Sequence, residues 1–554
     1  MHAWDRRPTS ECGPRRRSGP GKPAPPEKFI SPTLLTRHLQ RIFHEGVSGH
    51  IHAAPPSARE RVVPDHPQTS RTLRLWEALA LSVGLMGPTL AMGLNGAGVA
   101  ATVGKAVPLV FLLGLLGVGL VGYGFWRLTQ HFHHAGSVYA LAGATIGPRA
   151  GFFGGFALLG TYLAFLVCTL AATGVFAHAF LHALGMTSTG PWAVVTVVAA
   201  LGVTLLNSRD TRLTARTLLI AEGLGIAAML VLALVVIGRT GTGSAPRHQS
   251  FDLSVFTPGT ASFGAIMTAT VFAFLSWAGF EACASLGEET DDPRRNIPRA
   301  LAGSVLLTGV LYVLMMFVQS IGFGTDDKGV RQFAGAESAL VTLSGSYLGT
   351  WFSLVVAFTA VASAFAAALS SSAAAARMVS ALARDGFGPA GLARTEPVTG
   401  APTRALWLCG ALAAAITAVM YGLGTTAFDT YYWYATIGVL CVLVAYAVAG
   451  VGVIVFTLSH RNAIPRRELV IPLAGLGYLC FVFYQQSTGQ GAPYSYFPWI
   501  AAAWCATGLA VVLLAPSLAG RIGARLTSEM NGSQGPRQEQ NPEPPAADSM
   551  KVTS

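Results

Sequence analysis

Residues Phe274-Leu-Ser-Trp-Ala-Gly-Phe-Glu-Ala-Cys-Ala-Ser-Leu-Gly-Glu-Glu-Thr-Asp-Asp-Pro-Arg-Arg-Asn-Ile-Pro-Arg-Ala300 place Gly279 and Glu281 inside an apolar span, which then ends in a dense polar turn. A lipid bilayer tolerates a broken helix only where the freed backbone groups line a protein-enclosed cavity. An ionisable side chain such as that of Glu281 is costly there unless it has a partner. The segment therefore indicates a site that is embedded in a membrane.

The composition of the whole chain also indicates a membrane environment. Hydrophobic residues make up 52% and charged residues 11% of the 554 residues, against roughly 25% charged residues in soluble domains. Strand-period alternation is absent, which disfavours an outer-membrane barrel. We predict an all-α integral membrane protein with about twelve transmembrane helices, each near the roughly 20 residues that cross the hydrocarbon core. The expected spans are 79–103, 107–127, 152–178, 191–206, 217–238, 262–284, 301–322, 350–372, 405–423, 433–457, 469–485 and 496–516.

Arginine is distributed unevenly over the loops between these spans. The loops after even-numbered spans are rich in arginine, whereas the opposite loops hold few basic residues. By the positive-inside rule, both termini of this multi-pass protein are predicted to be cytoplasmic, in a plasma or bacterial inner membrane. The same bias explains the net charge of +11 without nucleic acid. The arginines concerned are Arg127, Arg149, Arg209, Arg212, Arg216, Arg294, Arg295, Arg299, Arg377, Arg384, Arg394, Arg404, Arg461, Arg466 and Arg467.

The two ends of the chain differ from its middle. Residues 1–70 and 521–554 lack hydrophobic periodicity, so we expect them to be disordered cytoplasmic extensions on either side of a transmembrane domain at 71–520. Six of the seven cysteines fall within predicted spans, which implies no disulfide framework. We also expect no metal site, because His131-Phe-His133-His134 at the end of the second span lacks neighbouring cysteine or carboxylate ligands.

Two of the predicted spans are interrupted. In the first span, Pro88 lacks a backbone donor, and Gly84 and Gly87 weaken the helix beside it, so we predict a break within 84–89. The sixth span is predicted to break within 276–280. Interrupted spans in equivalent positions of two halves are the best sequence indication of a transporter binding site, since half-helix ends offer free backbone groups and a dipole.

These motifs carry a resemblance to a known family. The first-span pattern, Gly279-Phe280-Glu281, the following polar turn and Arg377-Met-Val-Ser-Ala-Leu-Ala-Arg-Asp-Gly386 resemble the amino acid–polyamine–organocation (APC) superfamily of permeases. The resemblance implies a LeuT-like inverted five-plus-five repeat, with repeat one at about 75–240 and repeat two at about 260–458. It adds two extra C-terminal helices at about 468–518. It also implies alternating access around a substrate held between the first and sixth spans.

The resemblance also suggests which residues meet the substrate. Backbone groups around Met86, Gly87, Pro88 and Thr89 would receive a carboxylate, with Pro88 offering only a carbonyl. Ser276, Trp277, Ala278 and Gly279 would meet the amino group and side chain. A carboxylate suits a half-helix N-terminus and an ammonium suits unwound carbonyls. Trp277 and Phe280 are either an aromatic gate or packing residues.

Coupling candidates follow from the polar residues inside spans. Glu281 is expected to hold the broken helix or link it to neighbouring spans, and proton carriage is a second possible role. Glu222, in the fifth span, is a functional-site hypothesis because an intramembrane acid is costly. Proton-coupled members of the resembled family often have a lysine in that part of the fifth span, and this chain has none. Ser371 and its neighbours are either sodium ligands or serines bonded to their own helix.

The favoured hypothesis is a secondary active transporter, a symporter or antiporter, that moves an amino acid through the membrane without a cofactor. A proton or sodium gradient would supply its energy. Its partners would be a small-molecule substrate and the lipid bilayer, with no nucleic acid and no obligate protein partner. The alternatives are a polyamine or organocation transporter, an exchanger, and a non-transporting nutrient sensor of the same fold. An enzyme is not expected, because no nucleophile–base pair or metal set occurs within the spans.

Overall fold

The computed structural model describes residues 74–132, 138–186, 190–209, 212–286, 290–384, 386–396, 401–460, 463–488 and 490–528. The expected N-terminal extension at 1–70 and most of the expected C-terminal tail therefore lie outside the described residues. So do His133, His134, Glu288 and Glu289 from the motifs above. Every regular element within the described ranges is a helix, as predicted.

Eleven helices in the described residues are long and apolar enough to cross a membrane. The expected span at 191–206 corresponds to α7, which is apolar but has only 16 residues. At 1.5 Å per residue this is about 24 Å, short of the roughly 30 Å hydrocarbon core. The helices are α2 (Leu75–Met86), α3 (Pro88–Val103), α4 (Val107–Thr129), α5 (Val138–Thr145), α6 (Pro148–Ala183), α7 (Trp192–Asn207), α8 (Arg212–Gly241), η1 (Leu253–Phe256), α9 (Phe263–Trp277), η2 (Phe280–Leu286), α10 (Pro293–Phe323), α11 (Asp327–Ala334), α12 (Ala339–Leu348), α13 (Thr350–Arg384), η3 (Ala390–Ala393), α14 (Thr403–Gly422), α15 (Ala427–Ser459), η4 (Arg466–Leu469), α16 (Val470–Ser487), η5 (Tyr494–Tyr496), α17 (Phe497–Leu514) and α18 (Pro516–Ser528).

Both predicted breaks are confirmed. In the first span, α2 ends at Met86 and α3 begins at Pro88, and Gly87 between them has a left-handed backbone with φ 58° and ψ 62°. In the sixth span, α9 ends at Trp277 and the short helix η2 begins at Phe280, with Gly279 at φ 99°. Glycine adopts positive φ without steric cost, so the local sequence places these breaks.

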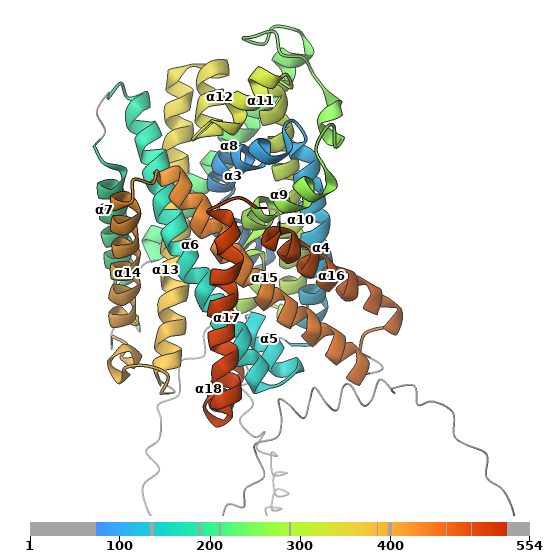
Figure 1. Cartoon of the computed structure of the whole chain (residues 1–554), viewed down its shortest axis with the longest axis vertical. Helices are drawn as coiled ribbons and strands as arrows, with labels where there is room; N and C mark the ends of the chain where they lie inside the picture. The colour runs from blue at the N-terminus through green and yellow to red at the C-terminus, as the bar shows by residue number, and fades with distance from the viewer. Residues whose placement is uncertain are drawn as a thin grey trace, which may run out of the picture. The chain divides into compact units, whose positions relative to one another are not determined.

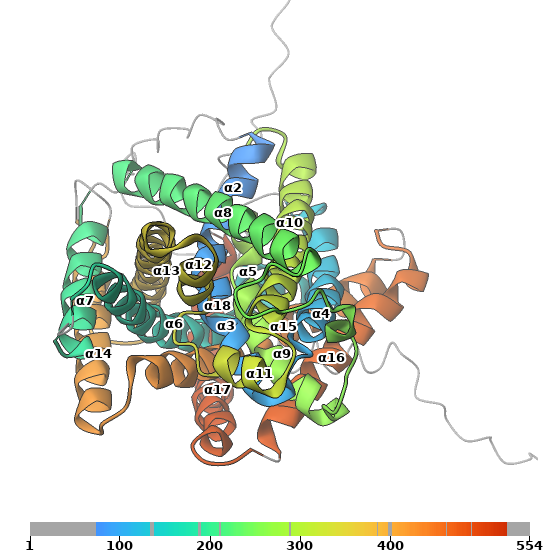
Figure 2. The same cartoon turned by 90° about the horizontal axis from the view of Figure 1, so that it is seen from above.

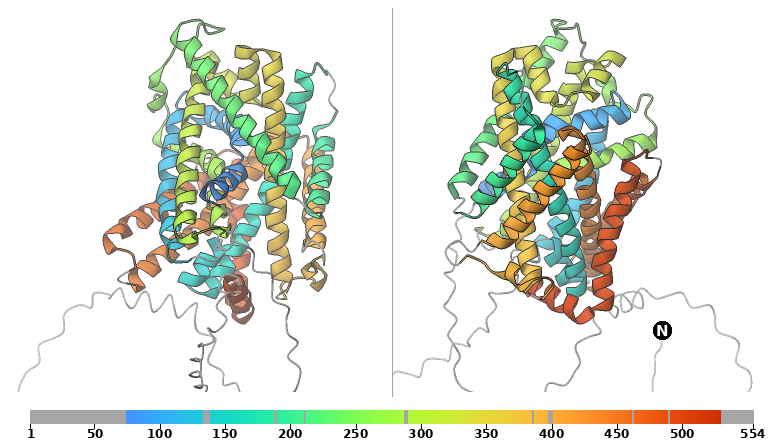
Figure 3. Two further views of the ribbon diagram at one scale, coloured as in Figure 1. Left: turned by 180° about the vertical axis from the view of Figure 1, so that it is seen from behind. Right: turned by 60° about the vertical axis from the view of Figure 1, so that its left-hand side comes forward.

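The two broken spans lie side by side near the middle of the bundle. Helix α3 packs against α9, and α2 packs against η2. Figure 2 shows α3 surrounded by other helices, with α8 crossing obliquely on one side, and the left view of Figure 3 shows the same oblique path. Helix α8 packs against α10 and α13, and the long helix α6 packs against both α13 and α15. The backbone at the breaks is therefore enclosed by protein rather than by lipid.

The two ends of the bundle carry different short helices (Figure 1). Helices α11 and α12 lie at the upper end of the view, where α11 and α12 pack against α3. Helices α5 and α18 lie at the lower end. We call it the arginine-rich end because Arg149 at the start of α6, Arg384 at the end of α13, Arg394 after η3 and Arg404 at the start of α14 lie there. Helix α18 runs past residue 521, where the C-terminal tail was expected to begin.

Candidate functional site

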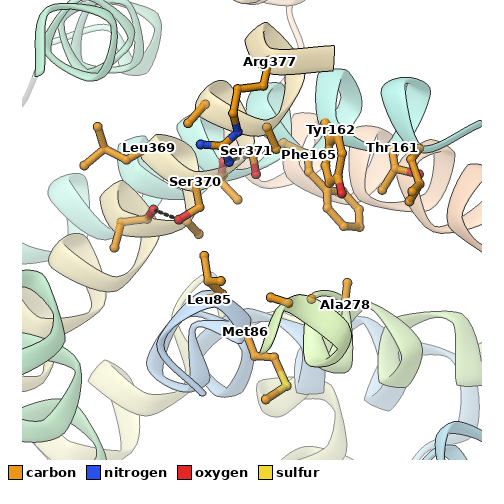
Figure 4. Close-up of a pocket in the computed structure, with 18 of the residues that line it drawn as sticks. Leu85, Met86, Thr161, Tyr162, Phe165, Ala278, Leu369, Ser370, Ser371 and Arg377 are labelled. Carbon is orange, nitrogen blue, oxygen red and sulfur yellow. Dashed lines mark hydrogen bonds between the residues drawn. The ribbon is translucent and has the colours of Figure 1, made fainter. Parts of the chain in front are cut away.

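A cavity of ≈ 740 Å³ lies between the two breaks and the helices α6, α8, α13 and α15. Its inner limit is formed by Asn95 and Tyr431, and its lining extends to Arg384, Thr395 and Pro402 at the arginine-rich end. In Figure 4, Tyr162 and Phe165 of α6 point into the cavity opposite Leu85 and Ala278. The remaining lining residues are Gly84, Met86, Leu90, Ala91, Tyr139, Leu158, Thr161, Cys168, Thr169, Asn207, Leu218, Leu219, Glu222, Leu275, Gly279, Glu281, Ala282, Ala366, Ala367, Leu369, Ser370, Ser371, Ala373, Ala374, Arg377, Met378, Ser380, Ala381 and Val442.

The four residues expected to receive a carboxylate lie at the break between α2 and α3. Met86 belongs to the cavity lining, but its side chain is buried and points away from the other labelled residues in Figure 4. Its sulfur lies 3.9 Å from the Thr308 hydroxyl of α10. Gly87, Pro88 and Thr89 are buried just behind the lining. The first residues of α3 therefore approach the cavity mainly through their backbone.

The backbone donors at the start of α3 are already engaged in this structure. Pro88 has no N–H, and the Thr89 N–H donates to Glu222 Oε1 at 2.8 Å. The Thr89 hydroxyl donates to the same oxygen at 3.0 Å, and the Leu90 N–H donates to Ser363 Oγ at 3.1 Å. The positive end of the α3 dipole thus faces a carboxylate that the chain itself supplies from α8.

The sixth-span break contributes two of its four predicted residues to the cavity. Ala278 and Gly279 line it, whereas Ser276 and Trp277 are buried outside the lining. Ser276 Oγ accepts a hydrogen bond from Asn95 Nδ2 at 2.7 Å, and the Asn95 amide oxygen accepts one from the Tyr431 hydroxyl at 2.6 Å. Asn95 thus joins α3 to both α9 and α15 at the inner limit of the cavity.

The two aromatic residues of this segment are packed inside the bundle. The Trp277 ring lies 5.1 Å from that of Tyr312, centroid to centroid. The Phe280 ring lies 5.7 Å from Phe125 and 5.6 Å from Tyr446, in edge-on contacts. Neither residue lines the cavity. Of the two roles considered for them, this arrangement favours packing, because aromatic rings gain stability from such edge-on contacts.

Glu281 lies on η2 and lines the cavity. Its Oε2 accepts a hydrogen bond from the Tyr446 hydroxyl of α15 at 2.7 Å. A second link comes from α2, where Ser82 Oγ accepts a hydrogen bond from the Cys283 N–H at 3.0 Å. These side chains attach the short helix η2 to two neighbouring helices. Their hydrogen bonds compensate part of the cost of an interrupted helix in the bundle.

A family model described as "Amino acid permease" matches residues 73–511, which is most of the chain. This chain belongs to the amino acid permease family. The family is part of the APC superfamily, so the resemblance of the motifs is confirmed.

Several curated relatives of this permease are transporters. The branched-chain amino acid permease BcaP of Lactococcus lactis is 25% identical over 434 residues, covering 75% of this chain and 89% of the relative. The BcaP of Bacillus subtilis is 24% identical over 362 residues, covering 62% and 74%. The low-affinity putrescine importer PlaP of Escherichia coli is 23% identical over 356 residues, covering 63% and 75%. Transport is thus the function supported for this permease.

Sequence reasoning missed several residues that shape the cavity of the permease. Asn95, Tyr431 and Ser363 come from three different helices, and their positions follow only from packing. Asn95 had a usable signal, because it is a lone amide within an apolar span. Arg377 lines the cavity with no hydrogen bond or ion pair to the described residues.

Ser370 and Ser371 of α13 line the cavity near Arg377 (Figure 4). Ser370 donates a hydrogen bond to the Ala366 carbonyl at 3.0 Å, within its own helix. Ser371 lies beside it in the lining, and Ser372 is fully buried. Ser370 therefore adopts the helix-bonded arrangement that we considered for this group.

Proposed function

We propose that this permease moves an amino acid across the plasma membrane by alternating access, with the solute bound between the broken spans. The observation that carries the proposal is the ≈ 740 Å³ cavity, which is bounded by Leu85 and Met86 at one break and by Ala278 and Gly279 at the other. Unwound carbonyls at the second break suit an ammonium group. A cavity of this volume lies in the range of small-molecule sites.

The cavity lining also supports a conformational assignment. It reaches the arginine-rich end through Arg384 and Pro402, whereas Asn95 and Tyr431 limit it on the opposite side. By the positive-inside rule the arginine-rich end faces the cytoplasm, with both chain termini on that side. The structure then corresponds to an inward-facing state, which would release solute into the cell or take it up from there.

An amine without a carboxylate is a second candidate solute. Glu222 and Glu281 both line the cavity, and two carboxylates in one site suit a cation. One of the similar proteins is named a putrescine importer. A transport assay therefore has to include amines beside amino acids.

The test is uptake of labelled amino acids and polyamines by the purified protein in liposomes, under an imposed proton gradient, a sodium gradient or neither. We expect gradient-driven accumulation of an amino acid, and loss of it in Gly279→Leu, because Gly279 has φ 99° beside the Leu85 carbonyl. Gly119→Leu is the matched control, since an added Cβ there meets nothing within 4 Å. Binding without any uptake or exchange would contradict transport and favour a sensor.

A further inference from the structure

The start of α3 places a helix N-terminus at the first break, beside the cavity. A solute carboxylate at this position would need the N–H groups of Thr89 and Leu90, since Pro88 has none. Both donors are taken, by Glu222 Oε1 at 2.8 Å and by Ser363 Oγ at 3.1 Å. Both N–H groups are therefore satisfied by side chains of the protein itself.

The hydrogen bonding of the Glu222 carboxylate at the start of α3 is incomplete. Its side chain is 4% exposed, and its Oε2 atom is buried with no hydrogen-bond partner among the described residues. Glu222 nevertheless belongs to the cavity lining, so its carboxylate lies beside a solute bound at the first break. The carboxylate is held by Thr89, by the Ser363 hydroxyl and by the helix dipole, and one of its oxygens stays unsatisfied. It is thus suited to exchange with another carboxylate.

We propose that Glu222 is a built-in competitor for the solute's carboxylate, and that each exchange between the two takes up one proton. This inference rests on the proposed function of amino acid transport. The carboxylate of the entering solute accepts the hydrogen bond from the Thr89 N–H, and Glu222 gives up this bond. A proton from water in the cavity binds the freed Glu222 oxygen, so that two carboxylates do not share a site of low dielectric. When the solute leaves, Glu222 releases the proton and returns to Thr89.

The groups around Glu222 assign the proton to this carboxylate. Helix α3 has no titratable side chain, and Tyr312 of α10 is the group in electrostatic contact with Glu222. A tyrosine hydroxyl stays protonated at neutral pH and cannot neutralise a carboxylate. The other titratable or charged groups on the elements packed against α8, or lining the cavity near it, are Glu77 of α2, Glu281 of η2, Arg294, Arg295 and Arg299 at the start of α10, Tyr347 of α12, and Arg377 and Arg384 of α13.

The experiment measures proton uptake on binding. Isothermal titration of the full-length protein in two buffers of different ionisation enthalpy gives the number of protons bound with each probe. The probes are L-leucine and L-arginine, and the amines isopentylamine and agmatine, which are the same molecules without the carboxylate. We expect about one proton with each amino acid and none with the amines. The Kd of the amino acids should rise about tenfold per pH unit, as expected for one linked proton.

Two variants localise the effect. In Glu222→Gln, amino acids should bind without proton uptake and with a Kd that no longer depends on pH. The amide is neutral, so its displacement from Thr89 frees no negative charge that a proton has to neutralise. Glu77→Gln is the matched control, since it removes a carboxylate of α2 that lies outside the cavity lining, and it should keep the proton uptake. Equal proton uptake in Glu222→Gln and the unmodified protein would overturn the proposal. The proposal would also be overturned if only the amines bound and if Glu222→Gln abolished their binding.

A measurement without solute separates this proposal from the proposed function. If none of the four probes binds, the proposed transport of leucine and arginine is contradicted. The infrared carboxylate band of Glu222, identified by its absence in Glu222→Gln, should still shift in Thr89→Val, which removes one of its two donors. An unshifted band would overturn the inference even if the protein transports amino acids.

Discussion

The Tyr431 hydroxyl of α15 donates a hydrogen bond of 2.6 Å to the Asn95 amide oxygen of α3, and both side chains are almost completely buried. The Asn95 amide nitrogen in turn donates a hydrogen bond of 2.7 Å to Ser276 Oγ of α9. Three helices that are far apart in the sequence are thereby joined at the inner limit of the cavity. If the permease alternates between two states, this cluster has to open when the cavity opens on the opposite side.

Tyr431→Phe should weaken this closure. It leaves the buried Asn95 oxygen without its donor, at a cost of about 1–3 kcal/mol to the closed arrangement. Cys168 lines the cavity and is buried, so it can report the change in a variant without the other cysteines. A membrane-impermeant thiol reagent, applied from the side opposite the arginine-rich end, should label Cys168 faster in Tyr431→Phe. Equal labelling rates would show that the cluster does not hold this side closed.

Gly87→Ala should destabilise the permease. Gly87 has φ 58°, where an L side chain costs about 1–2 kcal/mol, and a Cβ there would lie 3.3 Å from Ser363 Oγ. We expect a lower midpoint of thermal unfolding in detergent, together with reduced uptake. Gly119→Ala is the control, because it lies in the helix α4 with nothing within 4 Å of the added atom. A Gly87→Ala protein as stable as the control would contradict the need for a left-handed residue.

Two glycines on α8 offer a matched pair near Glu222. A Cβ at Gly225 would collide with the Thr89 side chain, whereas a Cβ at Gly223 meets nothing within 4 Å. Gly225→Ala should push the Thr89 hydroxyl from Glu222 and lower the initial rate of uptake by about tenfold, the effect of about 1.4 kcal/mol on the barrier. Gly223→Ala should transport at the unmodified rate. Equal rates in both variants would show that the close contact of α8 with α3 is not required.

Asp252, in the loop between α8 and α9, predicts a pH effect on stability. Hydrogen bonds from Ser254 and the charge of Lys105, 3.7 Å away, lower the pKa of Asp252 against a partial opposing effect of burial. A lowered pKa stabilises the fold above the unfolded-state pKa of about 3.9, and this contribution is lost as the pH falls through the folded-state value. Asp252→Asn should therefore cost up to about 1 kcal/mol at neutral pH and nothing in acid. Chemical unfolding at both pH values tests this, and a cost that persists in acid would contradict it.

The local features of this protein were predictable from its sequence. Breaks at Gly87 and Gly279 follow from backbone propensities that act within a few residues, and most spans follow from the length of apolar runs. The short helices α5, α11 and α12 were not predicted, since they are too short to stand out as spans. Helix α7 was predicted as a span, but with 16 residues it is shorter than the eleven helices that are long enough to cross a membrane. The motif at 274–300 was enough to predict the family that the comparison confirmed.

The sequence by itself therefore determined the membrane environment, the helical spans, the two breaks and the candidate acids Glu222 and Glu281. Only the tertiary structure decided what these acids contact. Glu222 and Thr89 are 133 residues apart, and Glu281 and Tyr446 are 165 apart. A hydrogen bond over such a separation depends on how the helices pack, and no local propensity encodes it. For the same reason the structure alone showed that the Thr89 N–H of α3 donates to the chain's own carboxylate, Glu222.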